Sequence, residues 1–192
     1  MVFRYDNTTM ILYIHGFASC GDSNKTRLLK QHFKNVLSPD IPVDPDEAIS
    51  FIQKTIIDNE VSLIIGSSLG GFYAAYFAQK FQIKSILLNP STQPFITLAP
   101  YVGTNEFFCS GESFEWTKEH IVKLMSYAIS KDSIKASVLV LLQKGDEVLD
   151  YQKAATLYEH YQLIIQENGN HRFENLDEYI QNIESFIKNS KC

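Results

Sequence analysis

One short stretch, residues 61–71, constrains the fold more than any other part of the chain. It reads V-S-L-I-I-G-S-S-L-G-G, and a helical pattern follows over residues 72–81. A strand, a sharp turn and a helix in this order are typical of G-x-S-x-G, in which a serine stands at the top of a parallel sheet. Ser68 has glycine two positions before and two positions after it, whereas Ser67 has Ile65 at the first of these positions. Ser68 is therefore the candidate nucleophile.

The flanking glycines, Gly66 and Gly70, have a steric explanation. A nucleophile on so tight a turn has a strained backbone, and a side chain two residues away would collide with the neighbouring strand or helix. Because the G-x-S-x-G motif is short, it could also occur by chance. The buried strand directly before it and the amphipathic helix directly after it argue against chance.

Strand and helix patterns alternate along the rest of the chain, which predicts an α/β fold with a mostly parallel sheet. The length of the chain fits a single domain over residues 1–192. Strands are expected at 9–14, 35–38, 61–66, 83–88, 138–142 and 162–166, and helices at 25–34, 45–58, 72–81, 151–161 and 176–188.

An activated serine needs a base, and the base needs a carboxylate that fixes its tautomer. On this kind of sheet both come later in the chain, the acid first, on loops after strands. Asp146 follows the strand at 138–142, and His171 follows the last strand. His120 and His160 lie inside helical patterns and are expected at the surface. Ser68, Asp146 and His171 are therefore the candidate triad.

Three acids lie near the end of the same strand, so the choice of acid has alternatives. Asp146 is nearest the strand end and follows the glycine that makes the turn. Asp150 is explained as a helix N-cap, and Glu147 as a solvated loop charge. Asp146 is the preferred acid.

Acyl transfer also needs N–H donors for the developing oxyanion. The backbone N–H of Leu69 is the first candidate, and that of Phe17, after the first strand, is the second. His15 and Gly16 precede Phe17, and His15 is expected to brace this loop by hydrogen bonding. Cys20 is expected to be a small buried or half-exposed thiol, because nothing near it would lower its pKa.

Composition and cysteine content limit the binding partners and the cellular compartment that we expect for this chain. The formal net charge is −5 and no basic cluster offsets it, which argues against nucleic-acid binding. Three cysteines, far apart and odd in number, make a disulfide framework improbable and favour a reducing, cytoplasmic setting. The first nine residues carry no apolar signal-peptide region, and no apolar run is long enough for a membrane span.

Two other chemistries are disfavoured. Residues 16–21 have the G-x-x-x-x-G spacing of a P-loop, but Asp22 stands where lysine must follow, and a carboxylate would repel phosphate. The five histidines are scattered, and neither H-E-x-x-H nor C-x-x-C occurs. We therefore expect no metal site and no cofactor.

The pattern loosens between residues 91 and 133, after the strand that ends at Leu88. Forty-odd residues are too many for a plain crossover, so the segment is expected to be a lid-like insertion over the working edge of the sheet. One helix is expected near residues 118–129. The aromatic side chains of this segment would either shape an apolar acyl pocket or seal the lid onto the sheet. They are Phe95, Phe107, Phe108, Phe114 and Trp116.

Five motifs follow one another along the chain. They are Ile14-His15-Gly16-Phe17, G-S-S-L-G-G at 66–71, Leu88-Asn89-Pro90, L-Q-K-G-D-E-V-L-D-Y at 142–151, and Gly169-Asn170-His171-Arg172-Phe173. Together they resemble the YqiA-type esterases, small bacterial members of the α/β-hydrolase superfamily. The likeness runs from residue 10 to residue 187.

The resemblance implies a serine esterase for carboxylic esters, with acyl-CoA thioesters as a further substrate class. It places the nucleophile on Ser68, the acid on Asp146 and the base on His171, and implies a minimal sheet of about five to seven strands. The expected partner is thus a small-molecule acyl ester or thioester. The alternatives are an acyltransferase with the same triad, and a binding protein on a hydrolase scaffold. The second normally has a broken triad, whereas this chain keeps all three residue types.

Overall fold

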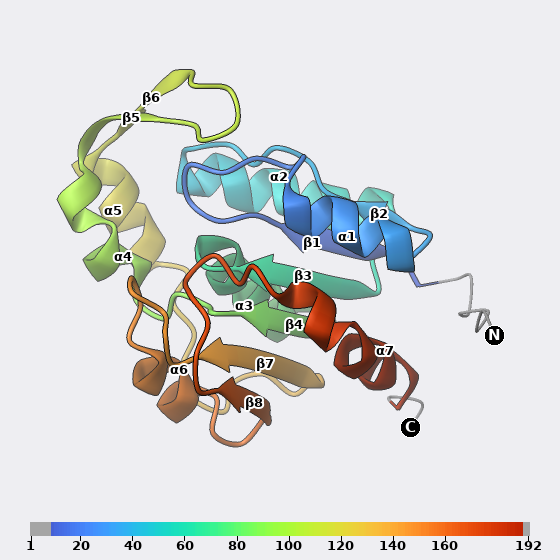
Figure 1. The fold of residues 1–192 in the computed structure, drawn as a ribbon. Helices are drawn as coiled ribbons and strands as arrows, with labels where there is room; N and C mark the ends of the chain where they lie inside the picture. Colours follow the sequence, from blue (N-terminus) through green and yellow to red (C-terminus); the bar gives the residue numbers. More distant parts are fainter. Residues whose placement is uncertain (1–8, 190–192) are drawn as a thin grey trace.

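The computed structural model describes residues 9–189, so most of the N-terminal stretch considered for a signal peptide, and Cys192, lie outside the described residues. Six strands form one sheet in the order β2-β1-β3-β4-β7-β8, and every pair in it is parallel (Figure 1). They are β1 (Ile11–Ile14), β2 (Val36–Leu37), β3 (Leu63–Ser67), β4 (Lys84–Leu88), β7 (Val138–Gln143) and β8 (Gln162–Gln166). The predicted α/β architecture with a mostly parallel sheet is confirmed.

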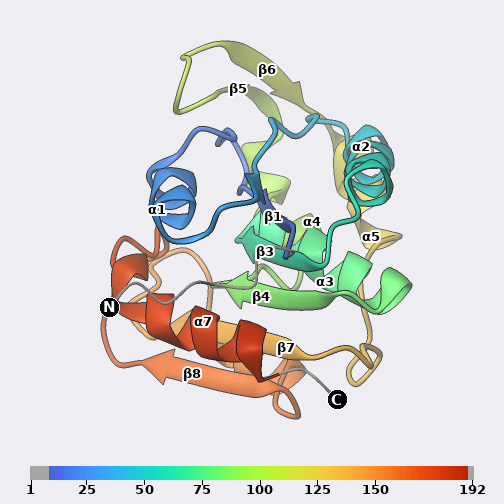
Figure 2. The ribbon, with the colours of Figure 1, turned by 90° about the vertical axis from the view of Figure 1, so that its right-hand side faces the viewer.

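Helices cover both faces of this sheet, as Figures 1 and 2 show. Because successive side chains of a strand point to opposite faces, Ile11 and Tyr13 of β1 pack on one side and Leu12 and Ile14 on the other. The first face carries α1 (Asn24–His32), the short 3₁₀ turn η2 (Leu176–Tyr179) and α7 (Ile180–Lys188). The second carries α2 (Pro45–Asp58), α3 (Leu69–Phe81), α5 (Lys118–Met125) and α6 (Tyr151–Leu157). Burial on both faces explains why the strands read as continuous apolar runs.

Three helices end earlier than the sequence pattern predicts, and the shortest difference is that of α1, which ends at His32 rather than at residue 34. Helix α5 ends at Met125 rather than near residue 129, and α6 ends at Leu157 rather than at Tyr161. The hydroxyl of Tyr161 exchanges hydrogen bonds with the backbone N–H and C=O of Ile134, which holds Tyr161 outside α6. His160 therefore lies in an exposed turn and not in a helix.

The segment between β4 and β7 contains a hairpin that the sequence pattern does not predict. It begins with α4 (Pro94–Thr97) and a 3₁₀ turn, η1 (Ala99–Tyr101), and ends with α5. Between them β5 (Gly103–Glu106) and β6 (Ser113–Trp116) pair antiparallel. The hairpin stands apart from the six-stranded sheet, at the top of Figure 1. None of the helices within residues 9–189 is long and apolar enough to cross a membrane.

Candidate active site

The turn between β3 and α3 holds Ser68 in a conformation that residues with a side chain rarely adopt, with φ 54° and ψ −117°. The chain is crowded around it. A side-chain carbon on Gly66 would overlap the backbone oxygen of Gly70, and one on Gly70 would overlap the backbone oxygen of Ile14. Glycine is thus required at both positions by close approach of the backbone.

The structure brings the three candidate triad residues into one hydrogen-bonded line. His171 Nε2 lies 3.0 Å from Ser68 Oγ, and His171 Nδ1 lies 2.8 Å from Asp146 Oδ2 and 3.0 Å from Oδ1. The Asp146 side chain is 2% exposed and that of His171 18%. A carboxylate accepts only, so Nδ1 carries the proton and Nε2 presents its lone pair to the serine hydroxyl. This is the arrangement in which an imidazole can take a proton from serine.

The other two acids of this loop have different partners. The carboxylate of Glu147 accepts the backbone N–H of His171 at 2.9 Å, and this hydrogen bond holds the pKa of Glu147 below its usual range. Asp150 caps α6 by accepting the N–H of Gln152 at 3.0 Å. Of the three alternatives, Asp146 alone bonds the His171 ring.

Buried amides support the His171 loop, a role that the sequence pattern does not predict. Asn89 accepts the N–H of Gln143 at 2.9 Å and donates to the carbonyl of Asn170 at 3.1 Å. The side chain of Gln143 accepts the N–H of Asn170 at 2.9 Å, and it fills the space beside Gly169, where φ is +98°. The signal that could have found them is a polar residue directly at the end of a buried strand, since buried polar groups need partners.

The predicted oxyanion donors lie beside the nucleophile. Gly16 packs against Ser68, and the next residue, Phe17, lines a pocket together with Leu69. Within residues 9–189 the backbone N–H groups of Phe17 and Leu69 donate to no other protein group. Both N–H groups thus meet one requirement of the predicted oxyanion donors, which must be free to bind an incoming oxygen.

His15 braces this loop and does not contact the triad. Its Nδ1 donates to the carbonyl of Gly16 at 2.9 Å, and its Nε2 accepts the N–H of Ile41 at 3.1 Å. Burial lowers the pKa of His15, and the acceptor role of Nε2 requires the neutral ring. The loop that carries Phe17 is thus held by a neutral, doubly bonded histidine.

A narrow apolar pocket adjoins the donors, with a volume of about 30 Å³. Of the five aromatic side chains expected to shape an acyl pocket, three line it, whereas Phe95 packs into the core and Phe108 is 80% exposed. The lining comprises His15, Gly16, Phe17, Ala18, Ile41, Pro42, Val43, Leu69, Tyr73, Phe107, Phe114 and Trp116.

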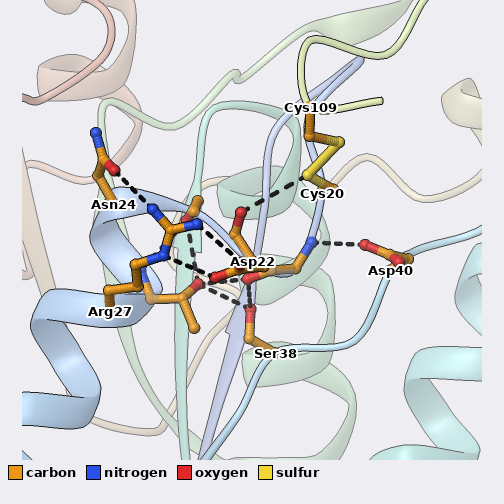
Figure 3. A network of polar contacts seen from close by, with 10 residues as sticks. Cys20, Asp22, Asn24, Arg27, Ser38, Asp40 and Cys109 are labelled. Atoms are coloured by element: carbon orange, nitrogen blue, oxygen red, sulfur yellow. Dashed lines mark hydrogen bonds and ion pairs between the residues drawn. A yellow bond between two sulfur atoms is a disulfide. The ribbon is translucent and has the colours of Figure 1, made fainter. Parts of the chain in front are cut away.

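The prediction for the cysteines is wrong: Cys20 and Cys109 form a disulfide between the loop after β1 and the tip of the hairpin (Figure 3). Their Cα atoms are 6.4 Å apart, within the usual range for such a bond. The two residues are separated by 89 positions, and only the hairpin brings them together. Nearby, Asp22 of the rejected P-loop pairs with Arg27. Across residues 9–189, no group of three or more His, Cys, Asp or Glu side chains could hold a metal ion.

The fold belongs to the α/β-hydrolase class. It superimposes on alpha/beta hydrolase domain-containing protein 10 from mouse with a TM-score of 0.73, at 16% identity, covering 94% of this chain and 90% of that one. A monoacylglycerol lipase from Paleococcus ferrophilus matches with a TM-score of 0.67, also at 16% identity, covering 93% and 91%.

The chain belongs to the uncharacterised protein family UPF0227, whose model matches residues 10–188. A member from Yersinia pseudotuberculosis is 26% identical over 192 aligned residues, covering 92% of this chain and 98% of the relative. The resemblance to the YqiA-type family is thereby confirmed.

Proposed function

We propose that this protein is a serine esterase that hydrolyses small-molecule carboxylic esters, with acyl-CoA thioesters as a further substrate class. The observation that carries the proposal is the line from Ser68 Oγ through the His171 ring to Asp146, with contacts of 3.0 and 2.8 Å. The similar fold of a monoacylglycerol lipase is a second support, because that name denotes an ester hydrolase.

The proposed reaction begins when His171 Nε2 takes the proton of Ser68 and the serine oxygen attacks the ester carbonyl. The N–H groups of Phe17 and Leu69 hold the oxyanion, and Asp146 stabilises the imidazolium that forms. His171 then gives its proton to the departing alcohol or thiol, which leaves an acyl group on Ser68. A water, deprotonated by the same ring, releases the acid and restores the serine.

Labelling with a fluorophosphonate probe, followed by peptide mapping, tests the activated serine. We expect modification at Ser68, and we expect Ser68→Ala and His171→Ala to abolish it. An ester panel with and without an added alcohol then separates hydrolysis from acyl transfer by the products formed. If the folded protein takes no label, the proposed triad is wrong and a binding function becomes the better explanation.

A further inference from the structure

The tip of the hairpin meets the loop after β1 through two links. One is the Cys20–Cys109 disulfide, and the other is a hydrogen bond of 2.9 Å from the N–H of Phe108 to the carbonyl of Ala18. Ala18 is next to Phe17, the proposed oxyanion donor. The hairpin is therefore tied directly to the loop that forms one wall of the site.

The two ends of the disulfide are held very differently, as Figure 3 shows. Directly after Cys20, the carbonyl of Gly21 accepts the hydroxyls of Thr26 and Ser38, at 2.7 and 2.8 Å. The N–H of Gly21 donates to Asp40 at 2.7 Å. Cys109, by contrast, is exposed at the end of a two-stranded ribbon, and such ribbons are marginally stable by themselves. The disulfide thus fastens the exposed tip of the hairpin to a loop that is firmly held by hydrogen bonds.

What the hairpin covers is the apolar pocket. Phe107, Phe114 and Trp116 come from the hairpin, and the ring centre of Phe17 lies 5.5 Å from that of Phe114 and 5.1 Å from that of Trp116. No charged side chain lines the pocket, since His15 is neutral and both its nitrogens are bonded. With about 30 Å³ of space and an uncharged lining, the pocket suits a short, uncharged acyl group.

We propose that the Cys20–Cys109 disulfide sets the acyl-chain length that the site accepts. With the disulfide formed, the hairpin closes the pocket and short aliphatic or acetyl-like esters are the substrates. Cleavage by a dithiol releases the hairpin, opens the pocket between Phe17 and Phe114, and admits medium-length acyl chains. In that step the dithiol loses two electrons and two protons to become a disulfide, and Cys20 and Cys109 gain them as two thiols. The inference depends on the proposed esterase function.

The test compares p-nitrophenyl acetate with p-nitrophenyl octanoate, before and after treatment with dithiothreitol. We expect the octanoate-to-acetate ratio of kcat/KM to rise about tenfold or more on reduction, since each additional methylene group that fits is worth a large factor in a hydrophobic pocket. Cys109→Ser should show the high ratio without dithiothreitol and respond to it no further. Cys192→Ser is the matched control and should respond as the unaltered protein does.

The fluorescence of Trp116 reports on the position of the hairpin whether or not the protein hydrolyses esters. Trp116 is the only tryptophan of the chain, it is buried, and it lines the pocket. Reduction should shift its fluorescence to the red and increase its quenching by acrylamide, and Cys109→Ser should have both properties from the start.

An unchanged chain-length ratio in an active enzyme would overturn the inference and leave the esterase function standing. Three free thiols in the denatured, unreduced protein would overturn it as well. If no ester is hydrolysed and Ser68 takes no label, the function is wrong, and Trp116 fluorescence still decides whether the disulfide holds the hairpin closed.

Discussion

The loops that carry Ser68, Asp146 and His171 differ in construction from the segment over residues 91–133. The loops start at the carboxyl ends of three parallel strands, β3, β7 and β8, and buried hydrogen bonds such as those of Asn89 support them. The hairpin of the segment is held by ring contacts, one disulfide and one backbone hydrogen bond to the loop after β1. In the proposed reaction the catalytic groups must be fixed to fractions of an ångström, whereas a pocket wall only needs the right shape.

Removal of the proposed nucleophile should give the largest effect in the molecule. Ser68→Ala is expected to lower kcat for p-nitrophenyl acetate by about 10⁵-fold or more, because the covalent route is lost. Ser67→Ala is the matched control one residue away, and its rate should stay within about tenfold of the unaltered protein. Greater loss in Ser67→Ala than in Ser68→Ala would contradict the assignment of the nucleophile.

The next largest effects compare substitutions of the neighbouring acids Asp146 and Glu147. Asp146→Asn should lower kcat about 10⁴-fold, since the amide favours the wrong tautomer of His171. Glu147→Gln weakens only an exposed hydrogen bond to the His171 backbone, so about tenfold or less is expected. Equal losses in both variants, measured in the same ester assay, would mean that Asp146 is not the specific partner of the imidazole.

The difference between the regions also explains what could be predicted from the sequence. Parallel strands end at one edge of a sheet, so Ser68, Asp146 and His171 could be expected to converge once their strands were recognised. Strand β5 (G-T-N-E) has no apolar side chain, and the apolar alternation of β6 (S-F-E-W) extends over only four residues, so the sequence does not mark a hairpin clearly. Without the hairpin, nothing indicated that Cys109 meets Cys20, or that Phe108 points away from the pocket region while Phe107 lines it.

The two regions should also differ in how much a lost amide side chain lowers the free energy of unfolding. Asn89→Ala leaves the buried N–H of Gln143 without a partner and removes one of the two hydrogen bonds that the carbonyl of Asn170 accepts, at a cost of about 2–4 kcal/mol in the free energy of unfolding. Asn105→Ala is the matched change in the hairpin, where the amide bonds the carbonyls of Tyr101 and Gly103 at 2.8 and 3.0 Å. Asn105 is only half-buried, so about 1 kcal/mol or less is expected. Urea unfolding measures both, and a reversed order would remove the distinction between the regions.

The smallest expected effect concerns His15, which lies where the two regions meet. Burial lowers its pKa, and the hydrogen bond to the carbonyl of Gly16 and the charge of nearby Asp40 only partly offset this. Below about pH 6.5 His15 therefore binds a proton in the unfolded chain but stays neutral in the folded chain. The free energy of unfolding consequently falls as the pH falls through this window. His15→Gln keeps an acceptor for the N–H of Ile41 but cannot titrate, so its melting temperature should decline less between about pH 7 and pH 5. Parallel declines in the two proteins would show that His15 is not held neutral, and that the loop of Phe17 is braced in another way.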